Sequence, residues 1–234
     1  MSSSARRARS DEVPETEDFY TVLLSMAGHD LRSRLQVITS AHRLLEKRLE
    51  GPEKLYLEHG QHAVKQLSGQ LEGILEAFRL YQNHHVVLSP VPLVPIMKAI
   101  EREAGELALR KKIGLAVQPA DVHICSNAIL LASILRNLVE NALKYTAPGG
   151  QVTVSCHCAG SSVRIEVSDT GAGISPEHLR KVFDAFYRVD GDKQEGVGLG
   201  LFIAKRAARL LGHRLDVSSE PGRGSCFSLT AERS

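Results

Sequence analysis

Residues 151–173 read QVTVSCHCAGSSVRIEVSDTGAG, and this stretch decides the fold of the C-terminal part of the chain. Apolar and polar residues alternate over 151–158 and again over 163–168, which is typical of a hairpin with one buried face. The second strand leads into Asp169, and Gly171 and Gly173 follow, where glycine lets a backbone approach a bound molecule closely. The pattern predicts a sheet that ends in a ligand loop. An Asx turn that closes the hairpin is the alternative.

Helical patterns flank this hairpin on both sides. We expect helices at 95–109, 127–145, 176–183 and 199–211, and further strands at 113–117, 214–219 and 225–231. This order predicts an α+β domain with helices on one face of a mixed sheet. Prolines at 90, 92 and 95 separate the domain from the sequence before it, so we place it at 88–234.

The N-terminal part has a different periodicity. Apolar residues between 18 and about 85 recur at spacings of three and four, which predicts two amphipathic helices with a coiled-coil seam, and Gly51 and Pro52 mark the turn between them. Two such helices cannot enclose a core, so we expect residues 18–87 to form a homodimeric four-helix bundle. Residues 1–17 lack the apolar segment of a signal peptide and are expected to be a disordered tail.

Composition excludes several classes of function. The chain has 29 Lys and Arg against 27 Asp and Glu, a net charge of +2, and only 5% aromatic residues without Trp, which argues against a nucleic-acid partner. No apolar run approaches the roughly 20 residues that span a bilayer, so no membrane span is expected. The four cysteines lack zinc-ligand spacing and are interpreted as reduced thiols of a cytoplasmic protein, with a vicinal pair at Cys156 and Cys158 as the alternative.

A second glycine cluster, Gly196, Gly198 and Gly200, opens directly onto an amphipathic helix. Unpaired amides and the positive end of the helix dipole suit a phosphate there. A Rossmann fold is not indicated, because no strand leads straight into the loop and no parallel βαβ pattern surrounds it. The cluster therefore predicts a phosphate-binding loop of another kind.

The helix over 127–145 carries Asn137, Asn141 and Lys144 on one face within two turns. Asparagine is a poor helix former, so such residues cost stability unless they bond to something. Amide oxygens together with a lysine suit a magnesium triphosphate, whereas a solvated helix face is the alternative. With the two glycine loops, this face predicts a nucleotide site.

Five motifs occur in a fixed order at 137–145, 169–173, 183–188, 196–200 and 222–225, and they resemble the N, G1, F, G2 and G3 boxes of sensor histidine kinases. Residues 29–35 resemble the H box of their dimerisation and phosphoacceptor hairpin, so the resemblance extends over about 18–231. It implies an α/β-sandwich ATP-binding domain of the histidine kinase, gyrase and Hsp90 type. It also implies autophosphorylation of His29 with ATP and Mg²⁺, followed by transfer to an aspartate of a separate response-regulator receiver.

The resemblance assigns roles residue by residue. Asp169 would bind the adenine amino group, Ser225 would support it through water, and Asn141 would coordinate Mg²⁺. The other cofactor-binding residues would be Asn137, Lys144, Tyr145 and Arg188 around the phosphates, and Gly171, Gly173, Gly196, Gly198 and Gly200 in the two loops.

The H box supplies the acceptor chemistry. A neutral imidazole at His29 keeps a lone pair for attack on the γ-phosphorus, and Asp30 would orient the ring or accept its other proton. Ser33 occupies the position from which family members activate a water against the receiver's acyl phosphate. Arg34 stands where most H boxes have proline, which puts signalling by helix bending in doubt.

Two other functions share part of this pattern. A related ATPase or anti-sigma-like serine kinase would have the nucleotide boxes without an H box on a heptad hairpin. A phosphotransfer scaffold with an inactive ATP domain would tolerate loss of Asn141 or Asp169, and both are present. Because the sequence before residue 18 is too short for a sensor, input is expected through a separate protein.

Overall fold

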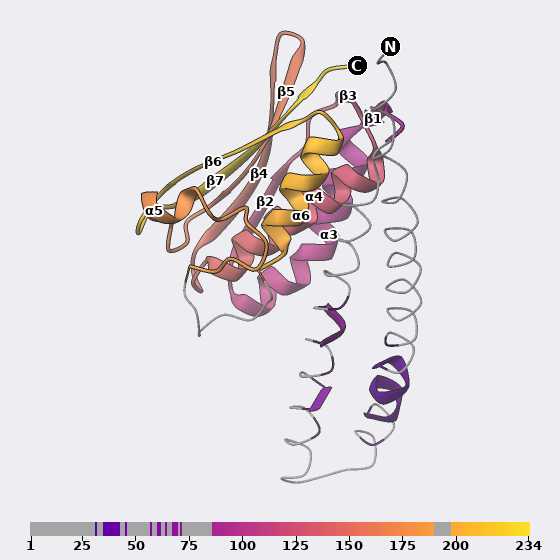
Figure 1. Ribbon diagram of the computed structural model, residues 1–234, viewed down its shortest axis with the longest axis vertical. Coiled ribbons are helices and arrows are strands. Elements are labelled where there is room, and N and C mark those ends of the chain that lie inside the picture. The colour runs from indigo at the N-terminus through magenta and orange to yellow at the C-terminus, as the bar shows by residue number, and fades with distance from the viewer. Residues whose placement is uncertain are drawn as a thin grey trace, which may run out of the picture. The chain divides into compact units, whose positions relative to one another are not determined.

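A computed structural model gives the fold of this chain (Figure 1). It describes residues 86–189 and 198–234 throughout, and in the N-terminal part residues 31, 35–42, 45, 57, 60–61, 64, 67–69 and 71. The chain divides into two compact units, Met1–Gln82 and Asn83–Ser234. All described residues of the first unit are helical.

The second unit contains seven strands and four helices within its described residues. In chain order these are β1 (Ser89–Pro92), α3 (Leu93–Lys111), β2 (Gly114–Gln118), β3 (His123–Ser126), α4 (Ala128–Tyr145), β4 (Gln151–Ala159), β5 (Ser162–Asp169), α5 (Pro176–Leu179), α6 (Gly200–Leu210), β6 (Arg214–Glu220) and β7 (Gly224–Glu232). Within the described ranges, no helix has the length and apolar character needed to cross a bilayer.

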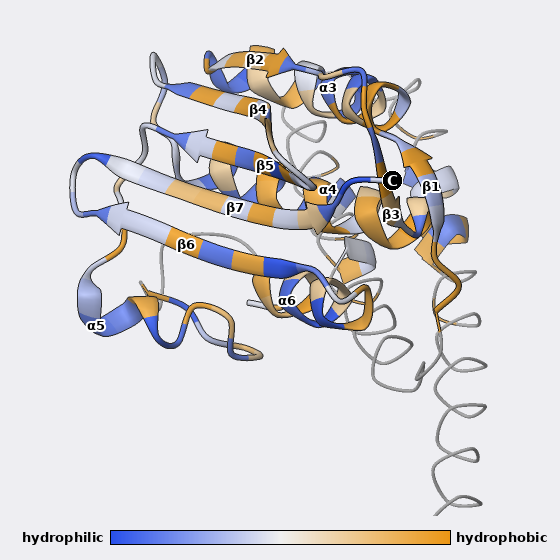
Figure 2. Cartoon of the chain, turned by 90° about the horizontal axis from the view of Figure 1, so that it is seen from above, coloured by the Kyte–Doolittle hydropathy of each residue, from blue (hydrophilic) through white to orange (hydrophobic). Residues whose placement is uncertain are grey.

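Five strands form one sheet in the order β2-β4-β5-β7-β6, in which β2 and β4 are parallel and the other neighbours antiparallel. Helices α3, α4 and α6 lie on one face of it, as Figures 1 and 2 show. The expected α+β class, with helices on one face of a mixed sheet, is therefore confirmed.

The core lies between this sheet and the helices. Alternating residues of the hairpin point inward, and α4 presents an unbroken apolar face to them because leucine and isoleucine recur at helical spacing. These side chains are almost completely buried: Val152, Val154, Val163, Ile165 and Val167 on the sheet, and Leu131, Ile134, Leu135 and Leu138 on α4. Burial of each such side chain is worth about 1.5–3 kcal/mol, so this layer fixes α4 against the sheet.

Several expected elements differ from the structure. Strands β1 and β3 were not expected, yet they pair antiparallel as a separate two-stranded sheet. Prolines are tolerated in β1 because it has a partner on one side only. The helix expected at 95–109 begins earlier, at Leu93, since Pro95 fits within a first helical turn. The helix expected at 176–183 is only the four residues of α5, followed by turns.

Helix α4 starts at a well-defined cap. The Asn127 side chain accepts hydrogen bonds from the N–H groups of Ile129 and Leu130, each at 3.2 Å, and its amide donates to the carbonyl of Val87 at 3.4 Å. The N-cap satisfies two amides that would otherwise lack a partner. Asn127 thereby ties α4 to the chain segment that enters the unit.

A buried polar contact links the small sheet to the turn after α6. The Oγ of Ser126 lies 2.9 Å from Nε2 of His213, and both residues are buried. Burial lowers the pKa of His213, and the nearby Glu232 offsets part of this effect. The folded state therefore prefers a neutral ring at this position.

We expect His213 to make the fold less stable in mild acid. Below its ordinary value near 6.5 the unfolded chain binds a proton before the folded chain does, so the free energy of unfolding falls as pH decreases. His213→Gln keeps a hydrogen-bonding amide but does not titrate. Thermal melts between pH 7.5 and 5 should show a smaller loss of stability in the variant than in the natural chain. If the melting temperatures of both proteins fell equally with pH, His213 would not be the origin of the pH dependence.

Candidate functional site

Asp169 closes β5 opposite Ser225 on β7, and its carboxylate is almost buried. Oδ1 accepts hydrogen bonds from the N–H of Gly171 at 2.8 Å and from the N–H of Ser225 at 3.3 Å. Both bonds described for the carboxylate end on this one oxygen. Oδ2 is thus the atom that a donor on a bound molecule would meet.

The electrostatics of this carboxylate favour a ligand. Burial raises the pKa of Asp169, and the N–H groups of Gly171 and Ser225 oppose that rise only in part. The ionised group therefore lies in an environment that disfavours its charge. A further donor at Oδ2 would offset this cost, which is a common property of binding sites.

Glycines around Asp169 allow backbone segments to meet. A Cβ at Gly171 would overlap the carbonyl oxygen of Tyr145 at the end of α4, and the N–H of Ala172 donates to the same oxygen at 3.3 Å. Gly224 has φ +95°, and a Cβ there would overlap the carbonyl oxygen of Asp169. The close approaches that these glycines make are to the protein's own backbone, which holds the loop against α4 and β7.

Ser219 is a residue of this region that sequence reasoning missed. Its hydroxyl donates to the carbonyl of Gly224 at 2.8 Å and accepts from the N–H of Ile174 at 2.8 Å. Because its single proton is used, the 2.9 Å contact with the Ser225 hydroxyl has Ser225 as the donor. The Ser225 oxygen keeps lone pairs for a water or ligand, and no local pattern could have singled out Ser219.

The polar face of α4 meets the start of α6. Asn137 donates through Nδ2 to the carbonyl of Ser133 at 2.9 Å, and its Oδ1 lies 3.0 Å from where a Cβ of Gly200 would be. Asn141 is half-buried one turn further along, and the Lys144 ammonium lies 5.1 Å from the Tyr145 ring centroid. The structure therefore brings Asn137 and Gly200 together, and places Gly171 against the end of the same helix.

Residues 183–188 reach Gly198 as well. The N–H of Phe186 donates to the carbonyl of Gly198 at 3.0 Å, and a Cβ on Gly198 would lie 2.7 Å from the carbonyl oxygen of Tyr187. Arg188 follows directly and is half-buried. Of the predicted site residues, Gly196, His29, Asp30 and Ser33 lie outside the described residues.

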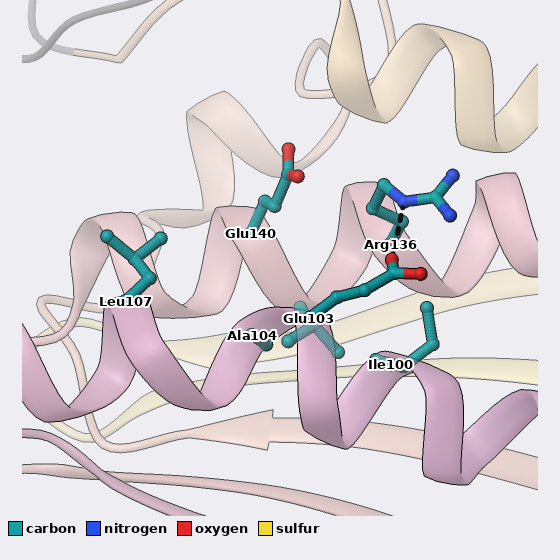
Figure 3. Close-up of a pocket in the computed structure, with 7 residues that line it drawn as sticks. Ile100, Glu103, Ala104, Leu107, Arg136 and Glu140 are labelled. Carbon is teal, nitrogen blue, oxygen red and sulfur yellow. Dashed lines mark hydrogen bonds and ion pairs between the residues drawn. The ribbon is translucent and has the colours of Figure 1, made fainter.

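A shallow groove lies elsewhere, between α3 and α4 (Figure 3). Arg136 and Glu103 face each other across it at 3.0 Å, and Ile100, Leu107 and Glu140 also line it. None of the predicted site residues lines the groove, and its ion pair is solvated, so little binding energy is available there. The candidate site remains the region bounded by Asp169, α4 and the start of α6.

Residues 126–234 match the family described as histidine kinase-, DNA gyrase B- and HSP90-like ATPases. Over 94% of its length the chain is 30% identical to the adaptive-response sensory kinase SasA of Crocosphaera subtropica, of which it covers 61%. Nearly the whole chain is therefore similar to sensor histidine kinases, and residues 126–234 match the ATPase family to which the histidine kinases give their name. This confirms the resemblance seen in the sequence motifs.

Two further similarities extend the comparison. The chain is 30% identical to the sensor histidine kinase AtsR of Burkholderia thailandensis, over 97% of this chain and 39% of that protein. The crystal structure of full-length ShkA in complex with AMPPNP has a TM-score of 0.76 and 27% identity, covering 92% of this chain and 46% of that one. The chain thus spans between about two fifths and three fifths of these relatives. Its second unit contains an ATPase domain of the histidine kinase type.

We expect Asp169→Asn to stabilise the nucleotide-free protein at pH 7. The raised pKa of Asp169 means that its ionised form costs folding free energy, and the cost appears as pH rises through the folded pKa. Asparagine keeps an acceptor for the two N–H groups without the charge. Urea unfolding at pH 7 and pH 4.5 should show the variant's gain shrinking at the lower pH. A variant less stable than the natural chain at pH 7 would contradict the prediction.

Proposed function

We propose that this chain is an ATP-dependent protein-histidine kinase that phosphorylates its own His29 and passes the phosphoryl group to an aspartate of a separate response-regulator receiver. The observation that carries the proposal is the nearly buried carboxylate of Asp169, whose two described hydrogen bonds both end on Oδ1, so that Oδ2 could accept a bond from a ligand. An amino group such as that of adenine supplies the donor that this oxygen requires.

The phosphates of ATP would lie toward the start of α6. The first amides of this helix have no intrahelical partners and Leu199 provides no side-chain cap, and the helix dipole favours negative charge there. Asn137 on α4 lies beside Gly200, and Lys144 and Tyr145 follow on the same helix. Arg188 would contribute from the segment whose Phe186 N–H bonds to the carbonyl of Gly198. Ser225, whose oxygen keeps lone pairs, would hold a water beside the adenine.

The donor set fits Mg²⁺ held mainly by phosphate oxygens. Among the described residues there is no group of three His, Cys, Asp or Glu side chains that could hold a metal alone. Asn141, half-buried on α4, offers a neutral amide oxygen, and Mg²⁺ at nucleotide sites is usually held by one or two protein ligands and the phosphates. Bound Mg²⁺ would neutralise charge that develops on the triphosphate.

The transfer step forms a P–N bond and breaks the bond between the γ-phosphorus and its bridging oxygen. A ring nitrogen of His29 attacks, ADP leaves, and Asp30 orients the ring or takes its other proton. A carboxylate oxygen of a receiver aspartate then attacks the phosphorus of phosphorylated His29, so that an O–P bond forms, the P–N bond breaks and the imidazole leaves. Ser33, one turn along, would position a water for the opposing phosphatase reaction.

Partners follow from the helical unit. Among its described residues, Val37 and Leu67 expose more than half of their side-chain surface, and Leu31, Ile38 and Leu45 between 43% and 48%. Apolar helix surface of this extent favours a second copy as its cover, which supports a homodimer of residues 18–87 joined to a catalytic domain of 88–234. The proposal also includes a cytoplasmic location and a separate input protein.

Similarity along the chain favours this function over a bare ATPase or an anti-sigma-like serine kinase. The ATPase family matches residues 126–234 alone, whereas similarity to a sensory kinase covers 94% of the chain and therefore includes most of the helical part. A bare ATPase or a serine kinase would not need an acceptor histidine on the helical part. An inactive scaffold is disfavoured because Asp169 and Asn141 are both present and Asp169 has its backbone donors in place.

We expect His29→Ala to abolish labelling by γ-labelled ATP while nucleotide binding is retained, because the acceptor and the nucleotide residues belong to different compact units. Asp169→Ala is the matched control: it should weaken ATP binding by about tenfold or more, as loss of a hydrogen bond to a charged group does. Labelled protein should lose its phosphate in acid. Acid-labile label that persists in His29→Ala would contradict the acceptor assignment.

We expect Asn141→Ala to lower the rate of Mg²⁺-dependent labelling by on the order of tenfold or more, with a smaller effect on affinity for adenosine. The physical reason is that the substitution removes the Asn141 amide oxygen as a ligand of Mg²⁺, at a site where the protein supplies few ligands. Arg136→Ala on the exposed side of the same helix is the control and should keep the natural rate. Unchanged labelling by Asn141→Ala at limiting Mg²⁺ would contradict the role in metal binding.

A further inference from the structure

Phe186 has an unusual backbone. Its φ is +64°, a left-handed conformation that is unfavourable for a residue with a Cβ, and the residue is 64% exposed. Such a conformation persists only when contacts on both sides hold it. Because the Phe186 side chain is exposed, its own packing does not fix this backbone conformation. The restraint must come from neighbouring residues.

One restraint is the contact with Gly198 described above. The other is on α5, where Nδ1 of His178 lies 2.6 Å from the hydroxyl of Tyr187. The Lys181 ammonium also lies 6.0 Å from the Tyr187 ring centroid. Tyr187 is therefore fixed at its side chain by α5 while its carbonyl lies against Gly198.

His178 is itself well anchored. Its N–H donates to the carbonyl of Ser175 at 3.0 Å, and its own carbonyl accepts from the N–H groups of Lys181 at 2.8 Å and Val182 at 3.0 Å. Its side chain is 29% exposed, with Glu177 at 3.7 Å on the opposite ring nitrogen. The histidine is thus a fixed point from which the Tyr187 side chain is held.

The core does not depend on the hydrogen bond between His178 and the Tyr187 hydroxyl. Residues 183–188 enter the core through Phe183, whose ring packs edge-on against Phe227 at 6.3 Å and carries the Lys205 ammonium at 4.9 Å. Beyond Phe183, the Asp184 N–H donates to the Lys181 carbonyl at 2.9 Å and the Tyr187 N–H donates to the Asp184 carbonyl at 3.3 Å. The Gly198 contact joins the segment to the start of α6, and the Tyr187 hydroxyl bond joins it to α5. Removal of the bond between His178 and Tyr187 should therefore loosen the chain just before Arg188 and leave Phe183 in place.

We propose that His178 is a positioning residue for nucleotide binding. Through its bond to the Tyr187 hydroxyl it holds the Tyr187 carbonyl against Gly198, and so sets where Arg188 and the first amides of α6 meet the phosphates of ATP. This inference rests on the proposed function, since it assigns Arg188 and α6 to ATP. It adds His178 and Tyr187 to the residues that determine affinity, although neither contacts the nucleotide.

The test uses the full chain and the affinity for a fluorescent ATP analogue, with thermal melting measured in parallel. His178→Ala and Tyr187→Phe should each weaken binding by roughly three- to tenfold, the range expected from one hydrogen bond. The double variant should be no weaker than either single one, because both remove the same interaction. Melting temperatures should change little, because the Phe183 contacts remain.

Two replacements at His178 separate positioning from bulk structure. Asparagine places an amide near the position of Nδ1 and should restore most of the affinity, whereas glutamine places it near Nε2 and should not. The inference would be overturned if His178→Ala bound the analogue with unchanged affinity. It would also be overturned if His178→Ala lost both affinity and thermal stability and His178→Asn did not restore the affinity. A natural chain that does not bind the analogue would instead overturn the proposed function, on which the inference depends.

Discussion

Burial of the Asp169 carboxylate is the constraint on which the arrangement of the second unit depends. A charged group that leaves water must be met by donors, and here the donors are backbone N–H groups from its own loop and from β7. Backbones can come this close only without a Cβ, which accounts for Gly171 and Gly224. Ser219 then fixes the second of these segments to the loop at Ile174. The end of the sheet is thus built around one carboxylate.

Helix α4 connects this carboxylate to the rest of the site. Its buried residues are apolar except for Ser133 and pack it into the core, so its position is determined by the core rather than by a ligand. Its other face carries the amides and the lysine, and its C-terminal carbonyl receives the loop after Asp169. A site on such a helix is held more rigidly than one on loops, which is an advantage where groups must be placed before the ligand arrives.

Local patterns in the sequence were sufficient for the elements that contain the site. Alternation at 151–168 gave the hairpin, helical spacing gave α4 and α6, and the glycine loops were found because they join these elements. Contacts between distant residues were not accessible in this way. Strands β1 and β3 are short, β1 contains two prolines, and their pairing joins residues that are distant in the sequence. Ser219 and His178 are likewise ordinary residues locally, whose partners Ser225, Ile174 and Tyr187 are set by tertiary structure.

Two features that cost stability lie within the sequence motifs: burial disfavours the charge of Asp169, and Phe186 is left-handed. Elsewhere in the described residues, Lys112 after α3 is also left-handed, and burial disfavours the charged form of His213. The core between the sheet and the helices follows the expected periodicities. Proteins tolerate such departures where binding repays them. At Asp169 and Phe186 the energetic pattern therefore agrees with the sequence motifs, independently of any similarity to kinases.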